Sequence, residues 1–257
     1  MIAVLDLNAD LGELPGHDGA ALDDDLLAVI TSANVACGGH AGDAESMSRV
    51  CAGAADRGVA IGAQVSYVDP DNFGRVRLDV PAGILTDQLA AQIGDLQSHA
   101  IAAASSVSYV KPHGALYHAA ATDPDVARAV VNAIAAHGAA LPVLTTPGSE
   151  LARAARSRGL IAVEEAFLDR GYLPDGRLVP RSDDGALITD PDAIRDRVET
   201  LVRDGAVFAI DGARVVLRPS SLCVHCDTPG APAIARLARS TLESLGVAVR
   251  PFIGPST

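Results

Sequence analysis

The feature that most constrains the fold of this chain is its regular alternation of short apolar runs with longer helix-forming segments. Runs typical of buried strands occupy residues 2–7, 31–37, 59–63, 107–110, 141–144, 160–163, 222–224 and 247–250. Helices are expected at 22–30, 44–57, 86–105, 124–137, 149–158, 191–204 and 229–245. This order predicts a parallel sheet with right-handed crossovers. A length of 257 residues favours one α/β domain that closes, or nearly closes, into a β/α barrel.

The segment 110–117, VKPHGALY, places a cation and an imidazole two residues apart at the end of an apolar run. Pro112 lacks an N–H and biases Lys111 toward an extended backbone, so the run is expected to be a strand that ends in a fixed turn. Side chains two apart on a strand share a face, so Lys111 and His113 are expected to point the same way. The alternative is a surface lysine beside a helix-capping histidine.

Polar side chains also follow the other predicted strands. Parallel sheets bind ligands at the carboxyl ends of their strands, so we expect one shared site there. The alternative, in which each cluster caps the next helix, explains Asp43 well but explains His40, Lys111 and His225 poorly. The clusters are Asn8/Asp10/Glu13, His40/Asp43, Gln64, Lys111/His113, Glu165/Asp169/Arg170 and His225/Asp227.

Charge and composition exclude several classes of protein. A net charge of −12 and a pI near 4.8 argue against a nucleic-acid partner, because no basic stripe is present. No basic segment precedes the first apolar run, and no apolar stretch reaches membrane-spanning length, so we expect a cytoplasmic protein without a membrane partner.

Two local patterns add smaller expectations. The C-x-x-C of Cys223 and Cys226 has no second C-x-x-C to complete a zinc site, so these residues, with Cys37 and Cys51, are expected to be free thiols. Asp175-Gly176 is typical of a tight turn and predicts a hairpin flap at about residues 171–181.

Six ordered segments resemble the LamB/YcsF family, the family of 5-oxoprolinase A subunits. They are DLNADLGE (6–13), SANVACGGHAGD (32–43), NFGR (72–75), VKPHGALY (110–117), EEAFLDRGY (164–172) and LCVH (222–225). The resemblance implies an irregular β/α barrel related to the polysaccharide-deacetylase-like fold. It also implies ATP-dependent opening of 5-oxo-L-proline to L-glutamate with two partner subunits, B and C, to which activation by ATP is assigned.

The resemblance also assigns site residues. Those expected to be catalytic are Asp10, His40, Lys111 and His113, and those expected to bind substrate are Asn8, Glu13, Asp43, Arg75, Glu165, Arg170 and His225. Gln64, at which this chain departs from the family, is also expected to bind substrate. The family usually has His-Pro where this chain has Gln64-Val65. In the related deacetylases one aspartate and two histidines hold a metal. Gln64 would remove one nitrogen ligand from an Asp10/His40 set, so a divalent metal is left open.

The chemistry of opening a lactam indicates roles for these residues. The reaction needs a base for water, a partner for the oxyanion and an acid for the leaving nitrogen. Asp10 or His40 is the expected base. Lys111 and His113 are expected to stabilise the oxyanion or a phosphorylated lactam oxygen, and Arg75 or Arg170 to pair with a substrate carboxylate through two nitrogens. No G-x-x-x-x-G-K-[ST] occurs, so ATP is expected to bind through the partners. A metal-dependent deacetylase or amidohydrolase for a small N-acyl or sugar substrate, and a non-catalytic substrate-binding subunit, are the alternatives.

Overall fold

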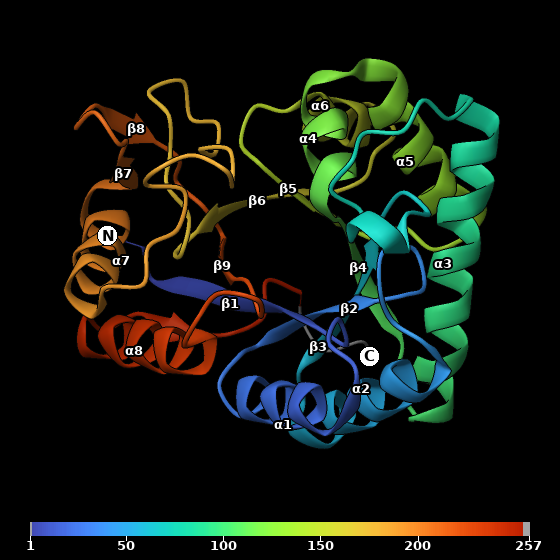
Figure 1. Ribbon diagram of the computed structural model, residues 1–257, viewed down its shortest axis with the longest axis horizontal. Coiled ribbons are helices and arrows are strands. Elements are labelled where there is room, and N and C mark those ends of the chain that lie inside the picture. The colour runs from blue at the N-terminus through green and yellow to red at the C-terminus, as the bar shows by residue number, and fades with distance from the viewer. Residues whose placement is uncertain (1, 254–257) are drawn as a thin grey trace.

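Within residues 2–253, which the computed structural model describes, seven parallel strands close into a barrel (Figure 1). Around the ring they are β1 (Val4–Leu11), β2 (Ser32–Ala36), β3 (Ala60–Val65), β4 (Val107–Pro112), β5 (Val143–Thr145), β6 (Ala162–Phe167) and β9 (Ser221–Val224). Pairing of β9 with β1 closes the ring, and β10 (Ala248–Val249) pairs with the first residues of β1. The predicted single-domain, irregular β/α barrel is confirmed.

Helices surround the barrel and bury their apolar faces against it (Figure 1). They are α1 (Gly16–Leu27), α2 (Ala44–Arg57), α3 (Ala82–Ala102), α4 (Gly114–Thr122), α5 (Pro124–Ala136), α6 (Glu150–Ser157), α7 (Pro191–Asp204) and α8 (Ala231–Ser244), with a 3₁₀ turn, η1 (Pro70–Asn72). On α3, Leu85, Leu89 and Leu96 recur at helical spacing and are buried. No helix within the described residues is long and apolar enough to span a bilayer.

The first strand is longer than the sequence pattern predicts. The pattern predicts an end at residue 7, with Asn8 and Asp10 in a turn, but β1 continues to Leu11. Leu5, Leu7, Ala9 and Leu11 lie in the main core cluster. The alternate residues Asp6, Asn8 and Asp10 form hydrogen bonds to side chains of neighbouring strands. Polar residues at every second position therefore belong to the strand, because this barrel is filled with hydrogen-bonded polar side chains.

The polar side chains inside the barrel form a hydrogen-bonded network that runs from its base to the carboxyl ends of the strands. Asp6 accepts hydrogen bonds from Thr31, Ser32 and Ser221, and burial, only partly offset by these bonds, raises its pKa to about 6. Asn34 donates to both Asn8 and Asp10 at 2.7 and 2.8 Å. The hydrogen bond from Asn34, itself part of this network, therefore holds the Asp10 carboxylate in position.

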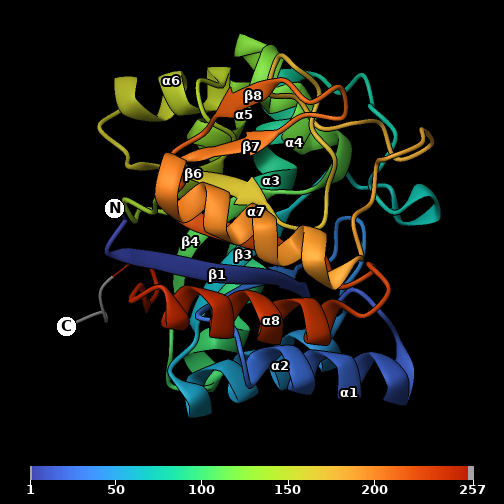
Figure 2. The same cartoon turned by 90° about the vertical axis from the view of Figure 1, so that its left-hand side faces the viewer.

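Two irregular pieces lie beyond the strand ends. The strands β7 (Ala206–Phe208) and β8 (Arg214–Val216) form an antiparallel hairpin above α7 (Figure 2). In the segment 171–181, Tyr172 and Leu178 form one antiparallel bridge around the Asp175-Gly176 turn. Both pieces contribute walls to the cavity described below.

Candidate active site

A cavity of about 700 Å³ opens at the carboxyl ends of the strands. It brings together seven of the predicted residues, namely Asp10, Gln64, Arg75, Lys111, His113, Arg170 and His225. Four more, Asn8, Glu13, His40 and Glu165, are buried and contact members of this group. Asp43 does not join them. It is exposed and caps α2, accepting from the Ser46 N–H in a capping box, so its predicted substrate contact is replaced by the helix-capping alternative.

Lys111 lies buried between two carboxylates at the floor of the cavity. Its Nζ is 3.1 Å from Glu165 Oε2, 3.5 Å from Asp10 Oδ1 and 3.2 Å from Asn8 Oδ1. Burial alone would lower the pKa of Lys111, but the Cys223 sulfur and the two carboxylates raise it well above its ordinary value. The ammonium is therefore charged. The three N–H groups of Lys111 already point at these neighbours, so they are not free to donate to a ligand. The ammonium can still attract a negatively charged ligand through its electrostatic field, and it holds Asp10 in position.

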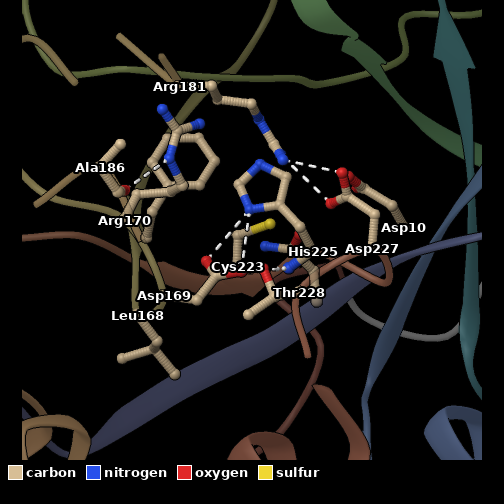
Figure 3. A network of polar contacts seen from close by, with 12 residues as sticks. Asp10, Leu168, Asp169, Arg170, Arg181, Ala186, Cys223, His225, Asp227 and Thr228 are labelled. Atoms are coloured by element: carbon tan, nitrogen blue, oxygen red, sulfur yellow. Dashed lines mark hydrogen bonds and ion pairs between the residues drawn. The ribbon is translucent and has the colours of Figure 1, made fainter. Parts of the chain in front are cut away.

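His225 and Asp169 form a histidine–aspartate pair at the cavity wall (Figure 3). His225 Nδ1 lies 3.0 Å from Asp169 Oδ1, and Asp169 also accepts from the His225 backbone N–H and the Thr228 hydroxyl. Burial would raise the pKa of Asp169, but the His225 contacts and the Thr228 hydroxyl hold it at about 2. The ionised carboxylate therefore accepts a hydrogen bond from His225 Nδ1–H, and this tautomer has its lone pair on Nε2.

This pair changes the role expected of His225. The ring stacks on Phe167 with centroids 5.2 Å apart, and no group within the described residues pairs with its Nε2. His225 lines the cavity, so it has the features of a general acid–base residue and not only of a substrate contact. Asp169 was expected in the shared polar site, in the cluster Glu165/Asp169/Arg170, but no catalytic or binding role was assigned to it. Asp169 and His225 are 56 positions apart in the chain, so no local sequence pattern indicates that they pair.

His40 and His113, by contrast, are fully engaged with the protein. Ser66 Oγ donates to the Tyr67 carbonyl and therefore accepts from His40 Nδ1, while His40 Nε2 lies 3.0 Å from Glu13 Oε1. Burial would raise the pKa of Glu13, but the His40 hydrogen bond lowers it. His40 is thus tied to a buried carboxylate and has no free nitrogen. Asp10, the other predicted base, does line the cavity.

Glu13, His40 and His113 are the group, among the residues described, whose ligand atoms all lie within 4.8 Å of one another. One carboxylate and two imidazoles suit a divalent transition metal in their chemistry. Their geometry does not, because the two rings stack with centroids 3.7 Å apart and planes at 6°, so their in-plane lone pairs run side by side and do not converge. Asp10, predicted to join His40, is not a member of this group.

We expect the purified chain to retain far less than one equivalent of divalent transition metal after dialysis, measured by mass spectrometry of the elements. The stacked rings would have to turn before both could bind one ion. A stoichiometric ion that disappears in a His113→Gln variant would contradict this expectation and favour the metal-dependent deacetylase alternative.

Arginines surround the cavity mouth. Arg75 and Arg181 both pair with Asp227, the latter through two nitrogens at 2.7 and 3.2 Å. Arg170 instead donates to the Ala186 and Val179 carbonyls, so it holds the surrounding loop. Arg75 is therefore the better placed of the two predicted carboxylate partners. Arg181, which sequence reasoning missed, also lines the cavity and pairs with Asp227 (Figure 3).

The fold and site define a β/α-barrel protein that has, at the carboxyl ends of its strands, side chains able to transfer protons and to bind negative charge. The chain belongs to the LamB/YcsF family, whose model matches residues 5–256.

Relatives and solved structures agree with this assignment. A Streptomyces avermitilis protein, named as the A subunit of 5-oxoprolinase, is 54% identical over 249 residues, which are 97% of this chain and 100% of that protein. The crystal structure of a lactam utilization protein from Thermus thermophilus has a TM-score of 0.88 at 38% identity, covering 97% of this chain and 100% of that one. A CE4 family pseudoenzyme from Bacillus anthracis, with a TM-score of 0.50 at 10% identity over 98% of this chain and 64% of its own, shares the fold alone.

Proposed function

We propose that this chain is the A subunit of an ATP-dependent 5-oxoprolinase, which opens 5-oxo-L-proline to L-glutamate together with subunits B and C. The names of its relatives support the reaction and a multi-subunit enzyme. The observation in the molecule that carries the proposal is the His225–Asp169 pair, whose Nε2 lone pair belongs to a cavity also lined by Asp10 and Lys111.

His225, Asp169 and Lys111 have different roles in the proposed hydrolysis. His225 Nε2 takes a proton from the attacking water and then returns it to the leaving ring nitrogen, so that the lactam C–N bond breaks and the amino group of glutamate forms. Asp169 keeps the imidazole in the tautomer with a free Nε2 and stabilises the imidazolium. Lys111, charged and held by Asp10 and Glu165, supplies a positive field for the developing oxyanion.

The rim of the cavity supplies recognition of the substrate carboxylate. The side chain of Arg75 is 42% exposed and uses one terminal nitrogen on Asp227, which leaves further N–H groups for a ligand. Arg181 pairs with the same carboxylate of Asp227. ATP is assigned to the partner subunits, because this chain contains no phosphate-binding loop of the G-x-x-x-x-G-K-[ST] type.

Reconstitution tests this proposal. Glutamate release from 5-oxo-L-proline, ATP and magnesium is measured for this chain alone, for subunits B and C alone, and for all three together. We expect release only from the full mixture, with ADP formed in proportion. No release with partners that are active beside a related A subunit would contradict the proposal.

A further inference from the structure

Gln64 carries an unsatisfied acceptor in the floor of the cavity. It lies on β3, is fully buried, and is one of the residues that line the cavity. Among the described residues no donor reaches its Oε1. A buried amide oxygen without a partner costs about 1–3 kcal/mol, so this atom is placed to receive a donor from a ligand.

The tautomer of the neighbouring His113 determines which atom of the Gln64 amide lacks a hydrogen-bond partner. His113 Nε2 lies 3.2 Å from the Phe73 carbonyl, which can only accept, so Nε2 carries the proton. Burial, followed by the charge of His40, lowers the pKa of His113 to about 3, so the ring is neutral and Nδ1 has a lone pair. Gln64 Nε2 lies 3.1 Å from that Nδ1 and donates to it. The Oε1 atom must therefore be the end without a partner.

We propose that Gln64 Oε1 accepts a hydrogen bond from the ring N–H of the substrate and so selects a lactam over rings that lack this N–H. The inference rests on the proposed function, since it assigns one contact of the same site. After the ring opens, the same oxygen accepts from the ammonium group of the product. Gln64 thus determines specificity by recognising the ring N–H of the substrate. This role accounts for glutamine at position 64 without reference to a metal site.

Because Gln64 Oε1 is buried, the site is expected to bind a ring without an N–H group weakly. A ring that carries oxygen in place of N–H would set a lone pair against Oε1 and leave that acceptor unpaired. A site built around a hydrogen bond discriminates strongly against an analogue that cannot make it. The lactone of the same ring, which keeps the carboxylate and the carbonyl, is therefore the informative probe.

The experiment compares 5-oxo-L-proline with this lactone in the full mixture of subunits, using the Michaelis constant for the lactam and the inhibition constant for the lactone. For the natural chain we expect the lactam to be favoured about tenfold or more. In Gln64→Met, which keeps length but has no amide, the preference should collapse to about onefold. Gln88→Met is the matched control, because Gln88 Oε1 is also buried without a partner but lies on α3 away from the cavity, and it should keep the natural preference.

Each outcome decides between the possibilities. Equal binding of lactam and lactone by the natural chain, or a preference that survives in Gln64→Met, would overturn the role of Gln64 while leaving the proposed function intact. If Gln64→Met does not fold, Gln64→Glu replaces it; this variant keeps an acceptor oxygen and should still prefer the N–H ring, so loss of the preference would refute the inference. No turnover or binding of either ring in the full mixture would count against the proposed function itself.

Discussion

Replacing His225 with glutamine is expected to lower kcat for lactam opening by about 10²- to 10⁴-fold, the usual contribution of a positioned acid–base group. His225 Nδ1 is committed to Asp169, so Nε2 is the ring atom available for proton transfer in the cavity. Glutamine keeps a similar reach and an N–H toward Asp169, but it has no atom that takes up a proton near neutral pH. The measurement is glutamate release by the variant combined with subunits B and C.

Asp169→Asn is the companion variant. Asp169 accepts from the His225 ring, the His225 backbone and Thr228, and an asparagine NH₂ facing the ring would favour the tautomer with hydrogen on Nε2. A loss of kcat as large as that of His225→Gln, with little change in KM, is expected. His137→Gln, at the end of α5, is a matched control that should leave both constants unchanged. A raised KM with normal kcat in the two site variants would contradict the acid–base role and favour the non-catalytic binding subunit.

The barrel and the location of its site could be predicted from the sequence because both depend on local patterns. Apolar runs, helix-capping residues such as Asp123 and the strand-ending Pro112 mark where elements begin and end. Polar residues that follow parallel strands must meet at one edge of the sheet, which is why Lys111, Gln64 and His225 line one cavity.

The pairing of these side chains could not be predicted, because it depends on the closure of the ring. Asp169 and Arg181 lie far along the chain from His225 and Asp227, and only the folded barrel brings them together. Asn8 and Asp10 resemble a turn in the sequence because the rule that a strand's buried face is apolar fails when a barrel is filled with hydrogen-bonded polar groups. His40 resembles a free base in the sequence, and only the folded chain brings Ser66 and Glu13 to its two ring nitrogens.

Lys111→Met is expected to remove activity and to destabilise the fold by about 3–5 kcal/mol, the cost of leaving a buried charge without its partner. Lys111 is the only lysine in a chain with 20 basic residues, and its Nζ lies between Asp10 and Glu165. Urea unfolding measures the loss of stability. Arg128→Met, which removes an exposed cation from a surface pair on α5, is the control and should show no measurable change.

The pH dependence of this deficit separates loss of charge from loss of packing. Without the ammonium, Asp10 and Glu165 are buried neighbours of like charge, so one of them is expected to take up a proton and its folded-state pKa rises above the value in the unfolded chain. Such a group favours folding at acidic pH and loses that contribution as pH rises, so the deficit should be larger at about pH 8 than at about pH 5. Adding Glu165→Gln to Lys111→Met should reduce both the deficit and its pH dependence. A deficit that is equal at both pH values and unchanged by Glu165→Gln would mean that Lys111 fills space and does not balance charge.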